Sequence, residues 1–419
     1  MSKVSIVGAY NTKFGAFVQK NKETGEITDL YSLYDLLLEA VRGAVQDSGF
    51  APEDIDAIWV GSFAPGVFTF QDHLGPLVLE AYPEAFRFKP TRRVEGACAS
   101  GSMAIYDAVF AIESGRFRNV LVVGVEKMNL LSTKGVTLGL AGASYWPTEG
   151  AKGMTFPGLF AEYAKGYKAH YGFDEALFRR MLASVAALMY RNGLENPLAH
   201  FGKGGPSDRL GLTTAEAILN LPDEKNPIVA DPLRLHDCSL VTDGAAAVVL
   251  MPTEEARKRG KPAVEIAGIG HTTERMPIDK RENMHELIAA KRAVAQAFAE
   301  AGVGTADLQA AEVHDCFTIN QLLCTEALGL SQDGKAGYDY MEGRFGPEDA
   351  CPVNLSGGLK AKGHPVGATG VSMHALLYKQ MTGNSIGAKR LRGVPEITAT
   401  LNVGGSAVTN AVSVLRRIS

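Results

Sequence analysis

The residue best suited to chemistry is Cys98, because small side chains surround it. It lies within the run Val94-Glu95-Gly96-Ala97-Cys98-Ala99-Ser100-Gly101-Ser102-Met103-Ala104, and an apolar pattern with helical spacing begins just after it. Small neighbours let a ligand approach the backbone closely, and a helix N-terminus favours negative charge and so lowers the pKa of a thiol. The pattern therefore suits an attacking thiolate. An inert cysteine packed in a tight strand–helix crossing is the alternative, because buried cysteines are common.

A second candidate, His364, lies between Gly363 and Pro365 in the glycine-rich segment 354–370. Glycine and proline hold such a loop in one conformation, so that the imidazole can be aimed at a neighbour. The ring could take the proton of a thiol and later donate a hydrogen bond to a developing oxyanion. A histidine that only satisfies a buried polar contact is the alternative. The segment is not a Gly-Lys-Ser/Thr phosphate-binding loop, since His364 follows the glycine.

A third cluster ends a predicted strand and has the sequence Val313-His314-Asp315-Cys316-Phe317. Ligands of α/β proteins bind at the carboxyl ends of strands, which makes this position a candidate site. His314 and Cys316 are two residues apart, so they would share one face if the strand continued. A metal site would need two further ligands, which the sequence does not group nearby. We therefore expect no metal.

The elements that must position these residues alternate between strand and helix. Strand-like runs rich in β-branched residues occur at 4–7, 55–60, 120–125 and 245–250, and a helix-length amphipathic segment occupies 31–48. Alternation of this kind predicts an α/β fold with buried sheets.

The chain also repeats itself. Residues 49–57 (GFAPEDIDA) are echoed by residues 302–310 (GVGTADLQA), and the helical patterns before them align at the same offset. Similar strands, at 4–9 and 264–269, open both units. Agreement in strand, helix and turn indicates an internal duplication. The segment 127–236 fits neither unit and predicts an inserted ligand-binding region. The expected domains are 1–126 with 237–258, the insertion 127–236, and 259–419.

Composition narrows the function classes. The 419 residues are 46% hydrophobic and 21% charged, with a formal net charge of −4, as in an ordinary globular enzyme without a nucleic-acid footprint. No uncharged apolar stretch is long enough to span a bilayer, and the N-terminus does not resemble a secretory signal, so we expect a cytoplasmic protein. The five cysteines are scattered without CxxC spacing, which argues against a disulfide framework or a structural zinc site.

Together the three candidate segments resemble the thiolase family, and the resemblance runs over nearly the whole chain. The Cys98 run is similar to the family's nucleophile loop, and Gly363-His364-Pro365, with Gly367 and Gly370, is similar to its histidine loop. Residues 238–247 (CSLVTDGAAA) resemble the strand that closes the first half. The resemblance implies a thiolase-like α/β fold: two duplicated βαβαβαββ halves packed as a five-layered α-β-α-β-α core with a loop-domain insertion.

Two departures from the common pattern point to one branch of the family. Asn402 stands in Asn402-Val403-Gly404-Gly405-Ser406, where many thiolases have a second catalytic cysteine. The usual Asn-Glu-Ala-Phe motif is replaced by His314-Asp315-Cys316-Phe317. Both changes resemble the sterol-carrier-protein-type thiolases and their bacterial and archaeal acetyl-CoA acetyltransferase relatives. In that branch the cysteine of the His-Asp-Cys-Phe motif supplies the second thiol, which implies that Cys316 compensates for the missing one.

The resemblance implies an acyltransferase that cleaves a 3-oxoacyl-CoA with coenzyme A, or runs the reverse Claisen condensation, through an acyl-Cys98 intermediate. Cys316 would remove a proton, His364 would activate Cys98, and His314 with His364 would polarise the thioester oxygen. The backbone N–H groups of Cys98 and Gly404 would form the second oxyanion hole. The segment 196–201, with His200 and Phe201, resembles a stretch that lines the acyl side.

The expected ligands are coenzyme A and its acyl thioesters as substrates, held by residues 127–236, with no permanently bound cofactor. The family is usually dimeric, and some relatives in this branch work with a small OB-fold protein that often bears zinc. A thiolase-superfamily condensing synthase is the nearest alternative, and a catalytically weak scaffold subunit is another. A fused lipid-transfer module lacks room, because the chain ends just after residues 408–415. The acyl group and the direction of reaction stay open.

Overall fold

The computed structural model describes residues 3–21 and 23–418. Strands overlap the runs 4–7, 55–60, 120–125 and 245–250, where the sequence predicts them, and all four are almost entirely buried. The strands are β1 (Val4–Asn11), β2 (Val18–Lys20), β3 (Ile27–Asp29), β4 (Ala57–Gly61), β5 (Thr91–Val94), β6 (Val120–Glu126), β7 (Ile228–Ala230), β8 (Leu233–Arg234), β9 (Gly244–Pro252), β10 (Ala263–Thr273), β11 (Ala310–Val313), β12 (Ile397–Gly404) and β13 (Thr409–Ile418).

The helices cover these strands on both sides. They are α1 (Leu33–Ser48), α2 (Pro65–Thr69), α3 (Pro83–Phe86), α4 (Ser100–Glu113), α5 (Thr133–Ala141), α6 (Phe156–Tyr171), α7 (Glu175–Leu194), α8 (Pro206–Arg209), α9 (Ala215–Leu219), α10 (Thr253–Lys258), α11 (Ile288–Ala301), α12 (Thr318–Ala327), α13 (Ala336–Met341) and α14 (Thr369–Met381). Within the described residues, no helix is both long enough and apolar enough to cross a membrane.

The main sheet has nine strands in the order β11-β12-β13-β10-β1-β9-β6-β4-β5. Strand β1 joins its two parts, because it pairs antiparallel with β9 on one side and with β10 on the other. In each part the strands that follow helices, β4 with β6 and β11 with β12, are parallel. Parallel strands need a crossover between them, which the helices supply.

The predicted duplication is confirmed by the topology. The order β1-α1-β4 in the first half matches β10-α11-β11 in the second, and β6 with β9 matches β12 with β13. Helices α1 and α11 both end at a left-handed glycine, Gly49 and Gly302, which is the usual way to stop a helix. Val353 lies parallel to Ala311 of β11, just as β5 lies beside β4. Segment 351–354 is therefore the counterpart of β5.

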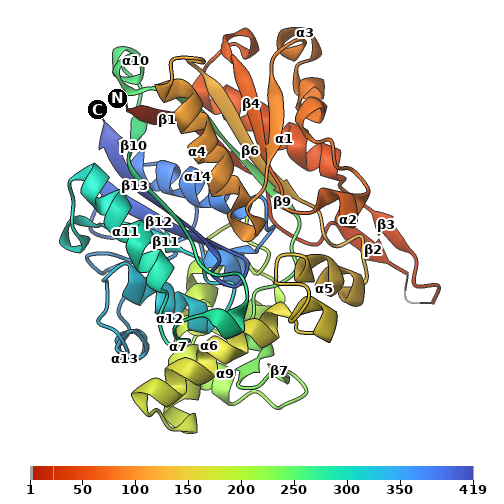
Figure 1. The fold of residues 1–419 in the computed structure, drawn as a ribbon, viewed down its shortest axis with the longest axis vertical. Helices are drawn as coiled ribbons and strands as arrows, with labels where there is room; N and C mark the ends of the chain where they lie inside the picture. Colours follow the sequence, from red (N-terminus) through yellow and green to blue (C-terminus); the bar gives the residue numbers. More distant parts are fainter. Residues whose placement is uncertain (1–2, 22, 419) are drawn as a thin grey trace.

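The layers follow from which helix covers which face. Helices α4 and α14 pack against each other between the two groups of strands, whereas α1 and α11 cover the outer faces (Figure 1). This arrangement is the five-layered core that the sequence predicts. One hydrophobic cluster unites both halves; its members include Val4, Ile6, Val120, Val248, Val264, Ile266, Val371 and Leu415.

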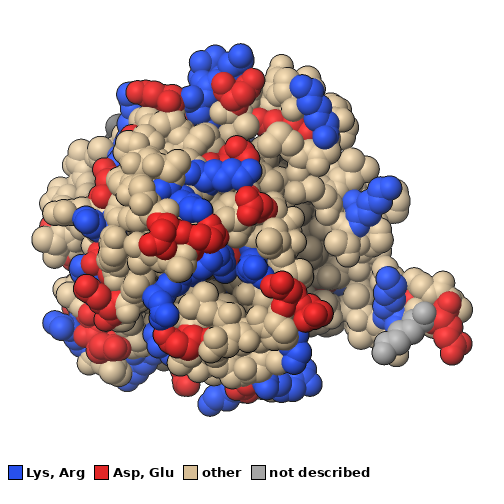
Figure 2. Space-filling model, turned by 90° about the horizontal axis from the view of Figure 1, so that it is seen from below, with Lys and Arg blue, Asp and Glu red and all other residues tan. Residues whose placement is uncertain are grey.

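The segment between β6 and β9 carries α5 to α9 and the short strands β7 and β8, which lie at the bottom of Figure 1. Helices α6 and α7 pack against α12 of the second half in a shared apolar cluster. Figure 2 views the molecule from that side and shows acidic and basic side chains interspersed, with the β2–β3 hairpin projecting to the right. The domain boundaries at residues 127 and 236 stay predictions.

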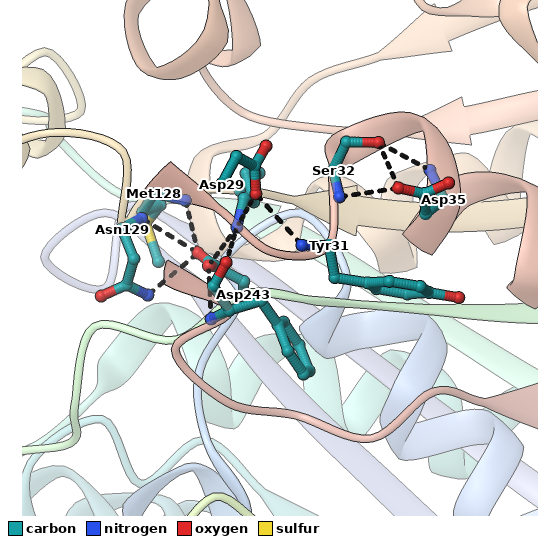
Figure 3. A network of polar contacts seen from close by, with 9 residues as sticks. Asp29, Tyr31, Ser32, Asp35, Met128, Asn129 and Asp243 are labelled. Atoms are coloured by element: carbon teal, nitrogen blue, oxygen red, sulfur yellow. Dashed lines mark hydrogen bonds and ion pairs between the residues drawn. The ribbon is translucent and has the colours of Figure 1, made fainter. Parts of the chain in front are cut away.

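A buried ion pair fixes the start of β9. Asp243 accepts hydrogen bonds from the backbone N–H groups of Met128 (2.7 Å) and Asn129 (3.0 Å), and its other oxygen lies 3.0 Å from Nζ of Lys127 (Figure 3). Lys127 also contacts Asp29 of the β2–β3 hairpin at 3.0 Å. A buried charge is stable only when it is paired and hydrogen-bonded, as here. The network therefore holds the segment just before β9 against the end of β6.

Candidate active site

Cys98 lies on the tight connection between β5 and α4. Ala97 adopts a left-handed conformation (φ 51°), the short 3-10 turn 97–99 follows it, and α4 then begins at Ser100. The helix thus begins where the sequence predicts, just after the nucleophile candidate. Gly404 packs directly against this turn. A Cβ atom on residue 404 would lie 2.3 Å from the carbonyl oxygen of Gly96. Only glycine fits there, which explains the small residues on both sides.

The pKa of the Cys98 thiol is raised, whereas the nearby helix N-terminus led us to expect a lowered pKa. Burial raises the pKa of its thiol to about 12, and hydrogen bonds from the backbone N–H groups of Gly405 and of Cys98 itself only partly oppose this. The expected lowering of the pKa was wrong, because desolvation of the thiolate outweighs the local dipoles. At neutral pH the resting group is therefore the thiol, which needs a base in order to attack.

His364 can supply that base. It follows a π-helical turn, 358–362, and the left-handed Gly363 (φ 121°), and its backbone bridges to Val241 just before β9. Its Nδ1 lies 2.8 Å from the hydroxyl of Thr369, and that hydroxyl donates to the carbonyl of Pro365. The ring must then carry its proton on Nδ1, which leaves Nε2 as a free acceptor. Burial lowers the pKa of His364 to about 3, so the ring is neutral.

His314 follows β11 and is fully buried. Its ring lies almost perpendicular to that of His364 (87°), with 5.0 Å between the centroids. Nδ1 of His314 lies 3.0 Å from Nδ2 of Asn402, whereas its Nε2 has no hydrogen-bond partner among the described residues. Burial, and then the neighbouring His364, hold the pKa of His314 well below its usual range. The ring is therefore neutral, with one nitrogen left for a ligand.

Cys316 lies in the loop between β11 and α12. The strand ends at Val313, as the sequence predicts, so His314 and Cys316 lie beyond it and do not share a strand face. Asp315 bends the backbone away, because its carboxylate accepts from the N–H groups of Leu359 (2.6 Å) and Lys360 (3.1 Å) in the π-helical turn before His364. Burial raises the pKa of Cys316 well above that of an ordinary thiol. This thiol is therefore protonated at rest and can donate a proton.

One cavity of about 160 Å³ joins three of the four predicted catalytic residues. Cys98, Cys316 and His364 line it, and His314 stands directly behind, because Sγ of Cys98 and one nitrogen of each imidazole lie within 4.8 Å of one another. A thiolate with two imidazoles is also a ligand set suited to zinc. Most of the remaining lining is apolar: Phe63, Met128, Val136, Leu140, Phe156, Leu240, Val241, Phe317 and Val366.

The remaining predicted site residues are Gly404, in the oxyanion hole, and His200 and Phe201, on the acyl side. Gly405 lines the cavity together with Cys98, and Gly404 and Gly405 both line an adjacent hollow. His200 and Phe201 are not on the cavity wall as described. Their backbone N–H groups donate to the carbonyls of residues 362 and 361, so they support the back of the π-helical turn. His200 instead lines a polar hollow with Lys13 and Lys203.

Sequence reasoning missed a supporting residue, Glu126. Its carboxylate is buried at the end of β6 and accepts from the N–H groups of Phe63 (2.7 Å), Ala64 (3.3 Å) and Gly367 (3.0 Å) and from the hydroxyl of Ser62 (3.1 Å). Burial raises its pKa to about 7. The only signal in the sequence is a carboxylate at the end of an otherwise apolar strand. Through Gly367 it fixes the loop that carries the base candidate.

Comparison with known proteins now bears on this site. Residues 4–254 match the family described as "Thiolase, N-terminal domain", and residues 270–417 match "Thiolase C-terminal domain-like". The chain is 34% identical over 417 residues to an acetyl-CoA acetyltransferase of Methanothermobacter thermautotrophicus, covering 100% of both chains. It is 29% identical over 341 residues to sterol carrier protein 2 of Rattus norvegicus, covering 76% of this chain and 57% of that protein.

A solved structure supports the fold. The Ltp2-ChsH2(DUF35) aldolase superposes with a TM-score of 0.77 at 21% identity, covering 99% of this chain and 97% of that chain. The chain therefore belongs to the thiolase family. Within it, the protein lies in the sterol-carrier-protein-type branch and is an acyltransferase.

Proposed function

We propose that Cys98 is the nucleophile of this thiolase, that His364 is its base, and that Cys316 exchanges the proton at the α-carbon of the acetyl unit. The observation that carries this proposal is that two thiols and an imidazole from distant parts of the chain line one cavity. His364 presents an unprotonated Nε2, as a base must. Cys316 presents a neutral thiol, as a proton donor must.

In the cleavage direction, the sulfur of Cys98 bonds to C3 of the 3-oxoacyl-CoA while His364 takes the thiol proton. The C2–C3 bond then breaks, and its electron pair leaves as the enolate of acetyl-CoA, which takes a proton from Cys316. The thiol of coenzyme A next attacks the acyl thioester and releases Cys98. The proton of the coenzyme A thiol replaces the one that Cys316 lost. His364 then returns to Cys98 the proton that it took in the first step.

Two oxyanions need hydrogen-bond donors in this sequence. The backbone N–H groups of Cys98 and Gly404 would hold the oxygen of the tetrahedral intermediate, and the proposal is supported by the position of the next residue, Gly405, on the cavity wall beside Cys98. His314 and the protonated His364 would hold the enolate oxygen. Donors that are fixed before the reaction begins are usually worth more than donors that must reorganise.

The acyl group that fits the cavity is short and uncharged. A volume of about 160 Å³ corresponds to roughly five water molecules, which leaves room for a few carbon atoms. As described, the lining contains no Lys, Arg, Asp or Glu to pair with a charged acyl chain. A panel of 3-oxoacyl-CoA esters with free coenzyme A should show highest kcat/KM for acetoacetyl-CoA or its near homologues, and poor turnover of long or carboxylate-bearing chains.

Several wider features belong to the same proposal. Residues 127–236 would hold coenzyme A, since α5 and α6 contribute Val136, Leu140 and Phe156 to the cavity wall. We expect a cytoplasmic homodimer. A small OB-fold partner is a further expectation, consistent with a structural neighbour whose name joins Ltp2 with ChsH2(DUF35). Light scattering of the purified chain, alone and after co-purification from its source, tests both assemblies.

The test of the catalytic assignment separates the two thiols. Cys98→Ala should abolish thiolysis and leave no acyl group on the protein by intact mass. Cys316→Ala should still be acylated at Cys98 by acetyl-CoA but lose exchange of the acetyl α-protons with D2O, because only the proton carrier is missing. Substantial turnover by the first variant, or equal loss of both half-reactions in the second, would refute these roles.

A further inference from the structure

Asn402, the residue that stands in place of the family's second cysteine, makes three buried contacts in the site. Its Oδ1 accepts from the hydroxyl of Ser102 at 2.9 Å. Its Nδ2 lies 3.2 Å from the carbonyl oxygen of Cys98 and 3.0 Å from Nδ1 of His314. The side chain is fully buried on β12. Both N–H groups of its amide and its oxygen therefore have partners within the protein.

These contacts define which way the amide points. The carbonyl of Cys98 can only accept, so the atom facing it must be the NH2 group. Turning the amide over would set two acceptor oxygens against each other and waste the Ser102 donor. The second N–H of the amide therefore points at Nδ1 of His314, which must accept and cannot carry a proton. A neutral ring with an unprotonated Nδ1 carries its proton on Nε2.

We propose that Asn402, held by Ser102, is a positioning residue that keeps His314 in the Nε2–H tautomer and so makes it a hydrogen-bond donor to the reacting thioester. The inference rests on the proposed function, because it gives His314 its role in that site. It also explains why Nε2 of His314 is buried without a partner within the described part of the chain. Such an orphaned donor is costly unless a ligand completes it.

The two histidines are thereby set in opposite tautomers by their neighbours. Thr369 accepts the Nδ1 proton of His364 and frees Nε2 to act as a base, whereas Asn402 donates to Nδ1 of His314 and leaves Nε2–H as a donor. With the tautomers exchanged, neither ring could perform its step. The two rings lie 5.0 Å apart and are both neutral at rest. His364 then acts as the base and His314 as the hydrogen-bond donor to the oxyanion.

The tautomer is tested in the wild-type protein, with one variant used to assign the signals. The protein is labelled with 15N-histidine, and long-range NMR correlations report which ring nitrogen bears the proton. The signals of His314 are those lost in His314→Gln. We expect an unprotonated Nδ1 and a protonated Nε2 for His314, and the reverse for His364. A protonated Nδ1 on His314 would overturn the inference, and this readout does not depend on turnover.

Asn402→Asp keeps the shape but replaces the donor with an acceptor. The carboxylate should draw the proton of His314 to Nδ1, and kcat should fall about 100-fold with little change in KM, because the lost donor acts on charge that develops during the reaction. Asn402→Ala, which leaves the tautomer free, should fall less. Wild-type ring signals or wild-type turnover in Asn402→Asp would contradict the proposal.

The matched control is Asn11→Asp. Asn11 is buried on β1 and its amide also donates to a backbone carbonyl, that of Thr12, but it does not contact a histidine. It should leave the His314 signals and kcat unchanged. If Asn402→Asp fails to fold, Ser102→Ala replaces it and should produce mixed tautomers of His314. Normal acylation of Cys98 with the wrong wild-type tautomer refutes this inference alone, whereas turnover by Cys98→Ala refutes the proposed function alone.

Discussion

At Cys98 and His364, burial acts on two pKa values in opposite directions. It raises the pKa of the thiol to about 12 and lowers that of the imidazole to about 3, so both groups rest uncharged. A charged pair in this apolar cavity would be expensive to hold without substrate. In the proposed mechanism the proton would therefore move from Cys98 to His364 only as the sulfur bonds to a carbonyl carbon. The resting site is in this way protected from oxidation and alkylation, which need the thiolate.

Alkylation of Cys98 by iodoacetamide should accordingly accelerate with pH. Because the thiolate fraction below the pKa rises about tenfold per pH unit, the rate should keep climbing from pH 7 to pH 10. The measurement is site-resolved mass spectrometry, with Cys351, whose pKa burial also raises to about 12, as an internal reference. A plateau of the Cys98 rate below pH 8 would contradict a neutral resting thiol.

The Cys98, His314 and His364 cluster also predicts how metals affect the enzyme. Overnight dialysis against EDTA should leave thiolysis unchanged, because the proposed steps use only protons and sulfur. Zinc should inhibit, since the thiolate and an imidazole nitrogen can bind it in place of substrate. Rates are measured with acetoacetyl-CoA before and after each treatment. Loss of activity in EDTA that zinc restores would show instead that the metal takes part.

The residue types of the site could be predicted from the sequence, but their supporting contacts could not. Cys98 and His364 stand out because glycine-rich loops mark close backbone approaches. The bond from Ser102 to Asn402 joins residues 300 positions apart, so local patterns do not reveal it. The pKa of Cys98 was predicted in the wrong direction, since desolvation depends on the whole cavity rather than on the adjacent helix.

At the scale of elements, the candidate catalytic residues lie in connections between strands and helices, and buried carboxylates hold these connections in place by hydrogen bonds. Glu126 ties the end of β6 to segment 62–64 and to Gly367 in the His364 loop. Asp315 ties the loop after β11 to the π-helical turn before His364. Each carboxylate accepts hydrogen bonds from more than one backbone N–H group, in the loops for Glu126 and in the π-helical turn for Asp315. Such groups must find partners when buried, which accounts for acids in an otherwise apolar site.

Glu126→Gln should therefore lower stability and activity together. The carboxamide replaces an accepting oxygen with an NH2 group that faces N–H donors, so we expect a loss of about 2 kcal/mol in the free energy of unfolding and a lower kcat through a displaced His364 loop. Urea denaturation and thiolysis rates measure the two effects. Glu265→Gln on β10 is the control, because among the described residues the carboxylate of Glu265 pairs, at 3.5 Å, only with the partly exposed Arg416. Equal effects of both variants would show that the Glu126 contacts are unimportant.

Strand and helix positions could largely be predicted, because hydrophobic periodicity and capping signals are local. The helix expected at 31–48 is α1, which begins after a capping box of Ser32 and Asp35. The loop after β11 could not be predicted in detail, because Asp315 binds a turn more than 40 residues further along the chain. Pairings of that kind depend on tertiary structure, which overrides local propensity.

At the scale of the whole molecule, the two halves share one core. The cluster around α4 and α14 draws apolar side chains from β1, β6 and β9 of the first half and from β10 and β13 of the second. Strand β1 also completes a single sheet with β10. The duplication was visible in the sequence because both copies keep the same turns. The shared core was not, since it depends on how the halves face each other.

Neither half should fold alone. Residues 1–258 would expose the face of α4 that packs on α14, so we expect the fragment to be insoluble or to lack a cooperative thermal transition. Co-expression with residues 259–419 should restore a soluble complex with thiolase activity. Circular dichroism and size-exclusion chromatography measure this. A stable monomeric fragment 1–258 would show instead that the halves are independent domains.

The correspondence between β5 and segment 351–354 has a further consequence. Each is followed by a loop that leads to a central helix: the first loop holds Cys98 before α4, and the second holds His364 before α14. A symmetric ancestor built from two identical copies would have presented the same loop twice across its axis. Were the two copies once identical, their fusion into one chain would have let the loops diverge, so that one now holds Cys98 and the other His364. The asymmetry of the chemistry is, on this view, inherited from a broken symmetry of the fold.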